Sequence, residues 1–403
     1  MNPIWVAGGI FLITFALIVS DRVHRTVSAL LGGIAMILLG VLSQETAFDA
    51  VDWNVIFLLA GMMIIANVLR ETGLFQWIAV QSVRLGKGDP FRILIILVVV
   101  TAITSAFLDN VTVVILVVPV TLVLAASLGV SPLPFLIAEI LASNIGGAAT
   151  LVGDPPNILI GSAANIDFVT FAANMTPISI IILIAFVGLS WFLFKEDLRK
   201  KEADNLDIEA FDASALITDA PLLRKSLIVM AGVVLGFLFH GALNLEPATI
   251  ALGGATILML WGRTDPHHVL REIEWTTLFF FIGLFIAVEA VVQVGIIEQV
   301  AQAALRLTGG SLPMTSMMLL WFSAVASGFV DNIPYTTAMI PVVESLGEAM
   351  PVMPLWWSLA LGADLGGNAT LVGAAAGVVV ASLAEKSGNP IGFGRFLRYG
   401  VIT

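Results

Sequence analysis

Two Asp-Asn pairs lie inside long apolar runs, where a carboxylate is costly. Asp109-Asn110 stands in SAFLDNVTVVILVVP, and Asp331-Asn332 stands in SGFVDNIPYTTAMIP, 222 residues farther on. A charged side chain at the centre of a membrane helix costs at least about 2.5 kcal/mol, so such residues mark ion, proton or substrate pathways. Asp and Asn also cap the free N–H groups of helices, and this structural alternative stays open for both pairs.

Two glycine-rich segments carry further polar side chains. They read SNIGGAATLVGDPPNILIG from Ser143 and GADLGGNATLVG from Gly362. Clustered glycine and proline residues interrupt a helix, and the free helix ends expose N–H donors and carbonyl acceptors that bind ions or polar substrates. The Asn and Thr side chains at these breaks can serve such a site or can join helices by hydrogen bonds.

The residues at the pairs and the breaks form one candidate set for binding a substrate or an ion. Its members are Asp109, Asn110, Asn144, Gly146, Gly147, Thr150, Asp154, Asn157, Asp331, Asn332, Asp364, Asn368 and Thr370. We expect Asp109, Asp331 and Asp364 also to carry protons, because a buried carboxylate can exchange a proton for a bound substrate or cation. Glu139 and Glu289 lie inside apolar runs too, where a proton relay and a hydrogen-bonded carboxyl are both open.

Several kinds of chemistry are excluded by what the sequence lacks. It contains no cysteine, which rules out disulfides and thiolate metal sites. It also lacks the P-loop, dinucleotide, zinc and nucleophile-elbow patterns. We therefore expect no cofactor, no resident metal, no enzymatic activity and no nucleic-acid partner, and an ATP-driven pump would need a separate ATPase subunit.

The composition is that of a polytopic membrane protein. Of the 403 residues, 59% are hydrophobic and 12% are charged, with a mean hydropathy of +1.02, whereas soluble domains are about 25% charged. We predict membrane helices near 3–20, 27–43, 53–70, 175–194, 225–243, 247–262 and 275–293. The first of these has no basic flank and no cleavage pattern, so we interpret it as a retained helix rather than a signal peptide.

Landmarks recur in the same order, which indicates an internal duplication. The Asp-Asn pairs and the prolines Pro119 and Pro341 are offset by 222 residues, and GGAATLVG from Gly146 returns as GGNATLVG from Gly366. We predict a first repeat over 1–166 and a second over 225–403, joined by a span and a charged loop at 167–224. Each repeat contains a hairpin (about 92–128 and 312–348) and a broken helix (about 133–166 and 354–386).

The distribution of basic residues predicts the orientation. A single joining helix inverts the second repeat, as in many secondary transporters. With the N-terminus outside and the C-terminus in the cytoplasm, only Arg306 of the 18 basic residues falls outside, in agreement with the positive-inside rule. We expect the plasma (inner) membrane of a bacterium or archaeon.

These motifs resemble those of the ion transporter superfamily across nearly the whole chain. Its most specific matches are the two glycine-rich segments, DNVT from Asp109 and DNIPYTTAMIP from Asp331. The superfamily includes arsenite efflux permeases, the pink-eyed dilution protein, bacterial sodium/proton antiporters and dicarboxylate transporters. The resemblance implies an all-α membrane fold of two inverted repeats, each with a re-entrant hairpin and a discontinuous helix, with elevator-type movement and a homodimeric assembly.

Three features depart from the pattern of the superfamily. Asp364 favours the arsenite permeases, because the pink-eyed-dilution-like branch often has an uncharged residue at this position. The second repeat has Ala374 to Gly377 where the first has Asp154 to Asn157, so we expect an asymmetric site. Relatives commonly continue into one more span beyond Thr403.

Our leading hypothesis is efflux of arsenite or antimonite in exchange for protons. Arsenous acid is uncharged near neutral pH and rich in hydroxyls, so amides, backbone groups and carboxylates suit it. Sodium/proton exchange through Asp109, Asp331 and Asp364 is the first alternative. Transport of an organic or inorganic anion is another, although neither break offers a basic residue, and a channel or membrane scaffold is the rival of a different class.

Overall fold

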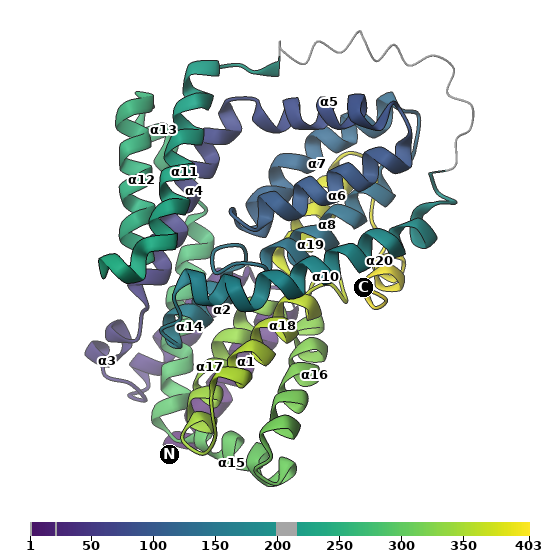
Figure 1. Cartoon of the computed structure of the whole chain (residues 1–403). Coiled ribbons are helices and arrows are strands. Elements are labelled where there is room, and N and C mark those ends of the chain that lie inside the picture. Colours follow the sequence, from purple (N-terminus) through teal and green to yellow (C-terminus); the bar gives the residue numbers. More distant parts are fainter. Residues whose placement is uncertain (1, 21, 199–215) are drawn as a thin grey trace.

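The computed structural model describes residues 2–20, 22–198 and 216–403, and helices are the regular elements of this part of the chain (Figure 1). The predicted charged loop therefore lies mostly outside the described residues. The first half contains α1 (Pro3–Ser20), α2 (Arg25–Leu38), α3 (Gln44–Asp49), α4 (Trp53–Glu71), α5 (Leu74–Gly86), α6 (Pro90–Ser105), α7 (Asn110–Ser127), α8 (Leu133–Gly147), α9 (Pro155–Ala163) and α10 (Phe168–Phe194). The second half contains α11 (Ala220–Leu243), α12 (Pro247–Gly262), α13 (Pro266–Arg271), α14 (Trp275–Gln293), α15 (Ile296–Thr308), α16 (Leu312–Val330), α17 (Asn332–Gly347), α18 (Met353–Gly366), α19 (Ala375–Lys386) and α20 (Phe393–Gly400).

Seven helices of the described chain are long and apolar enough to cross a membrane. They are α1, α4, α7, α10, α11, α14 and α16. Helices α4, α7 and α14 are mostly buried by neighbouring helices, whereas α1, α10, α11 and α16 expose most of their apolar surface. Apolar helices that stay exposed need lipid around them, so these four form the periphery. The predicted fold class, an all-α polytopic membrane protein, is confirmed.

The helices follow the same order twice, and each copy packs against the other. Helices α4 to α9 correspond in order to α14 to α19. Helix α2 packs along α14 and α12 packs along α4, while α9 contacts α17 and α19 contacts α7. Figure 1 shows the resulting group of α4, α11, α12 and α13 along one side. The core is therefore shared between the copies, and the boundaries of the two repeats stay a prediction.

Each copy contains a hairpin and an interrupted helix. Helices α6 and α7 are joined by the turn 106–109, and α16 and α17 meet at Asp331. Helix α8 ends at Gly147 and α9 begins at Pro155, while α18 ends at Gly366 and α19 begins at Ala375. These interruptions leave backbone groups free, which a membrane protein tolerates only where protein or water surrounds them.

Glycines let the hairpin and the interrupted helix approach closely in both copies. A Cβ on Gly146 would lie 2.1 Å from the carbonyl oxygen of Ala102, and one on Gly366 would lie 2.4 Å from that of Ala324. Serine hydroxyls add matching hydrogen bonds, from Ser105 to the Ser143 carbonyl at 2.7 Å and from Ser327 to the Ala363 carbonyl at 2.6 Å. Each hairpin is thus held against its own interrupted helix.

Several helix boundaries differ from the prediction. The short helices α3, α5, α13, α15 and α20 were not predicted, because they are too short or too polar to resemble spans. Helix α2 ends at Leu38 rather than near 43, since Gly40 adopts a positive φ of 72°. Helix α10 begins at Phe168 rather than near 175, because the Asp167 side chain caps it by accepting from the Thr170 N–H at 3.0 Å.

Candidate functional site

Asp154 lies at the centre of the candidate site. It precedes α9 and is fully buried, and its carboxylate accepts hydrogen bonds from two asparagine amides. Asn110 donates to Oδ2 at 2.7 Å, and Asn332 donates to Oδ1 at 3.2 Å. These two asparagines are the first residues of α7 and α17. The Asp-Asn pairs of the two hairpins therefore meet at one carboxylate.

A chain of buried amides extends from this carboxylate. Asn110 also donates to Oδ1 of Asn144 at 3.0 Å, and Asn144 donates to Oδ1 of Asn368 at 2.9 Å. Asn144 lies near the end of α8, and Asn368 lies in the break between α18 and α19. The two breaks and the first hairpin thus share one hydrogen-bonded network, which fixes the orientation of each amide.

Asp364 is the least satisfied polar side chain at the site. It is fully buried, and in the described part of the chain neither carboxylate oxygen has a hydrogen-bond partner. Asn157 lies beside it, but the Asn157 amide donates to the carbonyls of Gly147 and Thr150, both at 3.2 Å, and its own Oδ1 is unpartnered. A buried carboxylate must hold a proton or face a cation. Asp364 and Asn157 therefore offer three oxygen atoms to such a group.

Asp109 and Asp331 both cap the helices that follow them. Asp109 accepts from the Thr112 N–H at 2.9 Å and from the Thr112 hydroxyl. Asp331 accepts from the Ile333 N–H at 3.0 Å and has a positive φ of 64°. The capping alternative is thus realised for both residues. It leaves Oδ2 of Asp331 free for another partner.

That partner is Arg25, which corrects the expectation that neither break offers a basic residue. Nη1 of Arg25 lies 3.3 Å from Oδ2 of Asp331. The guanidinium also lies 5.7 Å from the centroid of the Phe280 ring. Arg25 begins α2, in the other copy, so no local spacing links it to Asp331. Arg25 lies between two predicted spans, so we interpreted it as one of the basic residues that face the cytoplasm.

Four of the remaining candidates lie around this centre and contact backbone there, and their role in binding stays a prediction. The hydroxyls of Thr150 and Thr370 donate to the carbonyls of Ala106 and Gly328, which ties each break to its hairpin. Gly146 and Gly147 lie in buried close approaches of backbone to backbone. Glu139 lies outside the centre and accepts from the Thr121 hydroxyl at 2.6 Å, although its Oε2 is unpartnered in the described chain. Glu289 is partly exposed.

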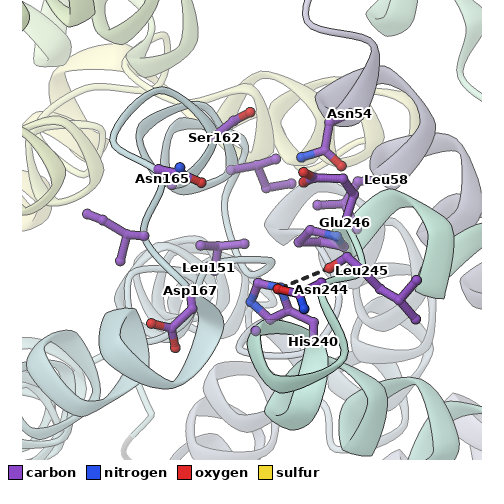
Figure 2. A pocket seen from close by; sticks show the side chains of 15 residues that line it. Asn54, Leu58, Leu151, Ser162, Asn165, Asp167, His240, Asn244, Leu245 and Glu246 are labelled. Carbon is purple, nitrogen blue, oxygen red and sulfur yellow. Dashed lines mark hydrogen bonds between the residues drawn. The ribbon is translucent and has the colours of Figure 1, made fainter.

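Two cavities adjoin the turns between the first two helices of each copy. One, of about 300 Å³, is lined by the α1–α2 turn with His24 and Arg25, by Asp331, and by the start of α19. The other, of about 470 Å³, is lined by the α11–α12 turn, the start of α4 and the end of α9 (Figure 2). We call them the Arg25 cavity and the His240 cavity. Asp331 lies on the wall of the first.

His240 joins two elements at the second cavity. Its Nε2 accepts from the Phe168 N–H at 3.0 Å. Its Nδ1 lies 3.2 Å from the Leu245 carbonyl oxygen (Figure 2). Asp167 also lines this cavity. Burial raises the pKa of its carboxyl, but the hydrogen bonds from Thr170 outweigh burial and hold this pKa below its usual value. The described residues that line this cavity include no lysine and no arginine.

Comparison with known proteins identifies relatives over nearly the whole chain. The profile of a family described as citrate transporter matches residues 15–362. An uncharacterized transporter of Mycobacterium tuberculosis is 44% identical over 407 residues, which cover 99% of this chain and 94% of the relative. The human P protein is 32% identical over 485 residues, but this chain spans only 58% of its length.

A solved structure shares the fold. The YdaH transporter of Alcanivorax borkumensis, described as having an unusual topology, aligns with a TM-score of 0.57 and 14% identity. The alignment covers 100% of this chain and 95% of that one. At this identity the similarity concerns the fold alone.

Proposed function

The chain belongs to the citrate transporter family and is a membrane transporter rather than an enzyme, and from this premise we propose that it exports arsenite or antimonite in exchange for protons. The observation that carries the proposal is the pair of fully buried carboxylates, Asp154 and Asp364, set among asparagine amides. The charge of Asp364 acts on Asp154. Two such groups are costly to keep ionised together, so a proton bound in this pair can leave when a substrate enters.

The chemistry of the centre favours an uncharged, hydroxyl-rich substrate. The amides of Asn110, Asn144 and Asn368 offer both donors and acceptors, as the hydroxyls of arsenous acid require. The family description names citrate, which carries carboxylates that Asp154 and Asp364 would repel. Arg25 already pairs with Asp331. An organic anion is therefore the less favoured substrate, even though helix N-termini can partly replace basic residues.

Sodium/proton exchange is the second candidate, and the unpartnered oxygens support it. Hard cations prefer oxygen ligands, and Asp364 with Asn157 offers three that have no partner in the described chain. No group of three or more His, Cys, Asp or Glu residues converges on one point among the described residues. A sodium ion would therefore also need backbone carbonyls of the two breaks.

The proposal includes a location and an assembly. We place the chain in the plasma membrane of a bacterium or archaeon with the N-terminus outside, as the basic residues indicate. We also propose a homodimer. Exchange driven by a proton gradient needs no ATPase, whereas an associated ATPase subunit would make transport depend on ATP.

Transport into inside-out vesicles tests the function. With an acidic interior imposed, we expect arsenite and antimonite to accumulate inside and to dissipate the pH gradient, while sodium and citrate do not. Asp364→Asn should abolish this exchange, and Asp49→Asn, which removes an exposed carboxylate, should not. If sodium alone dissipates the gradient, the arsenite assignment fails and the second candidate replaces it. If citrate alone is accumulated, both fail.

A further inference from the structure

Arg25 and Asp331 form an ion pair between a helix start of one copy and a hairpin tip of the other. The two side chains are 29% and 15% exposed, so water screens the pair less than it screens a surface pair. The guanidinium is further held against the Phe280 ring. Arginine keeps its charge at any physiological pH. The tip carboxylate of the second hairpin thus faces a permanent cation.

The tip of the first hairpin has no such cation in the part of the chain that the structure describes. Asp109 has no ion-pair partner in the described chain, and its carboxylate accepts hydrogen bonds from the N–H and the hydroxyl of Thr112. The position that corresponds to Arg25 in the second copy, 222 residues farther on, is Pro247. Pro247 lines the His240 cavity, where the titratable groups are Asp167, His240 and Glu246. The start of α2, at the Arg25 cavity, therefore carries a positive charge, whereas the corresponding start of α12, at the His240 cavity, does not.

The groups that face Asp331 are few. Arg25 contacts Asp331 from α2, and His24, in the α1–α2 turn, lines the same cavity. Asp154, in the break before α9, interacts electrostatically with Asp331. Glu274, which precedes α14, lies within electrostatic reach of Arg25 and of Asp109. Arg25 is the permanent cation in this group. It stabilises the ionised form of Asp331 against the neighbouring carboxylates.

Inverted repeats relate the two end states of a transporter. The predicted inverted repeats would be related by a pseudo-two-fold axis in the membrane plane, so we expect the opposite state to exchange their roles. We expect Asp331 then to take surroundings like those of Asp109 here, and Asp109 to approach Pro247 instead of an arginine. In that expected state neither tip carboxylate contacts a permanent cation from the described part of the chain.

We propose that Arg25 is the residue that releases the transported proton. A proton that leaves the Asp154–Asp364 pair passes to Asp331, whose charge acts on Asp154, and Arg25 displaces it from Asp331 in the state in which the Arg25 cavity is formed. This inference rests on the proposed proton exchange. The O–H bond of the Asp331 carboxyl breaks and the proton passes to water in the Arg25 cavity. In the opposite state the carboxylate, now without its cation, takes a proton from water on the other side. Each cycle moves one proton toward the predicted cytoplasmic side, which is the direction that drives export.

Substitution of Arg25 should alter the pH profile rather than abolish folding. In proteoliposomes with arsenite as the probe, we expect Arg25→Gln to be at least about tenfold slower at pH 7 on the Arg25 side. We expect the midpoint of its pH profile on that side to rise by about one unit or more, the usual effect of removing a charge within contact distance. Arg25→Lys should restore most of the rate and the midpoint. Arg22→Gln, at an exposed arginine three residues away, is the control.

Two results would overturn the assignment. One is a transport rate of Arg25→Gln that falls by the same factor at every pH, which would indicate a structural role only. The other is proton-coupled exchange by Asp331→Asn at the wild-type rate, which would show that the transported proton does not pass through Asp331.

A second measurement needs no substrate. The sequence contains no cysteine, so single cysteines can report the state of the molecule through maleimide labelling. Val378→Cys reports the Arg25 cavity, and Ser162→Cys reports the His240 cavity. Rates are divided by that of Glu45→Cys, at an exposed position, which removes the intrinsic pH dependence of thiol labelling. Arg25→Gln should raise the pH midpoint of Val378→Cys labelling by about one unit or more and should favour Ser162→Cys labelling.

This readout separates the two proposals. If the wild type moves no arsenite while the labelling midpoint still shifts, the proposed substrate fails and the role of Arg25 stands. If arsenite is exchanged for protons while the midpoint stays unchanged, the proposed function stands and the role of Arg25 is wrong.

Discussion

At the scale of single residues, the site assigns different tasks to carboxylates that look alike in the sequence. Asp109 and Asp331 cap α7 and α17, and Asp331 also pairs with Arg25. Asp154 accepts the two hairpin amides, and Asp364 has no hydrogen-bond partner in the described chain. A cap needs only an acceptor oxygen, whereas a proton carrier needs an ionisable group. Neutral substitution therefore separates the two roles.

We predict that Asp364→Asn and Asp154→Asn abolish proton-coupled exchange, while Asp109→Asn stays within about threefold of the wild type, because Asn caps a helix about as well as Asp. Exchange is measured in proteoliposomes, and thermal unfolding in detergent serves as the control for folding. Loss of exchange in Asp109→Asn at an unchanged unfolding temperature would instead make Asp109 a proton carrier.

At the scale of helices, small residues decide how closely each hairpin approaches its interrupted helix. The glycines Gly146 and Gly366 occupy corresponding positions, and both lie against backbone carbonyls of the hairpin. A carbonyl on a packed helix cannot move aside as a flexible side chain can. The match between the copies indicates that this close approach is a requirement of the fold.

We predict that Gly146→Ala lowers the free energy of unfolding by about 1–3 kcal/mol or more, the usual cost of overpacking. Gly253→Ala, at a helix position with nothing within 4 Å, should be neutral or slightly stabilising. Both are compared by thermal unfolding of the purified protein. An unchanged unfolding temperature in Gly146→Ala would show that α6 and α8 can separate at little cost.

At the scale of the whole molecule, the two copies depend on each other. Helix α2 packs along α14, α12 packs along α4, and the Arg25–Asp331 pair spans the same boundary. The apolar faces of α4 and α14 would be left uncovered if one copy folded alone. The candidate site likewise contains Asn110 from one copy and Asn332 from the other.

We predict that halves divided between residues 198 and 216 do not fold separately. Each half expressed alone should aggregate in detergent, and co-expression should restore a species that elutes and unfolds like the intact chain. The measurements are size-exclusion chromatography and thermal unfolding. A single half that unfolds cooperatively on its own would contradict the shared core.

The sequence by itself determined the membrane class, the repeated order and the polar residues of the centre. Hydropathy and the cost of buried charge are properties of short segments, so the sequence alone reveals them. The duplication identified Asp109 and Asp331 as corresponding residues. The amphipathic helices α5 and α15 were missed, because their periodicity is that of a surface helix and not of a span.

Only the tertiary structure decided which groups meet. It selected Asp154, rather than the hairpin carboxylates, as the acceptor of both asparagines, and it left Asp364 unpartnered in the described chain. It also brought Arg25 to Asp331 across 306 residues of sequence. Such contacts depend on how the two copies interleave, and the packing of distant helices leaves no periodic signal in either segment.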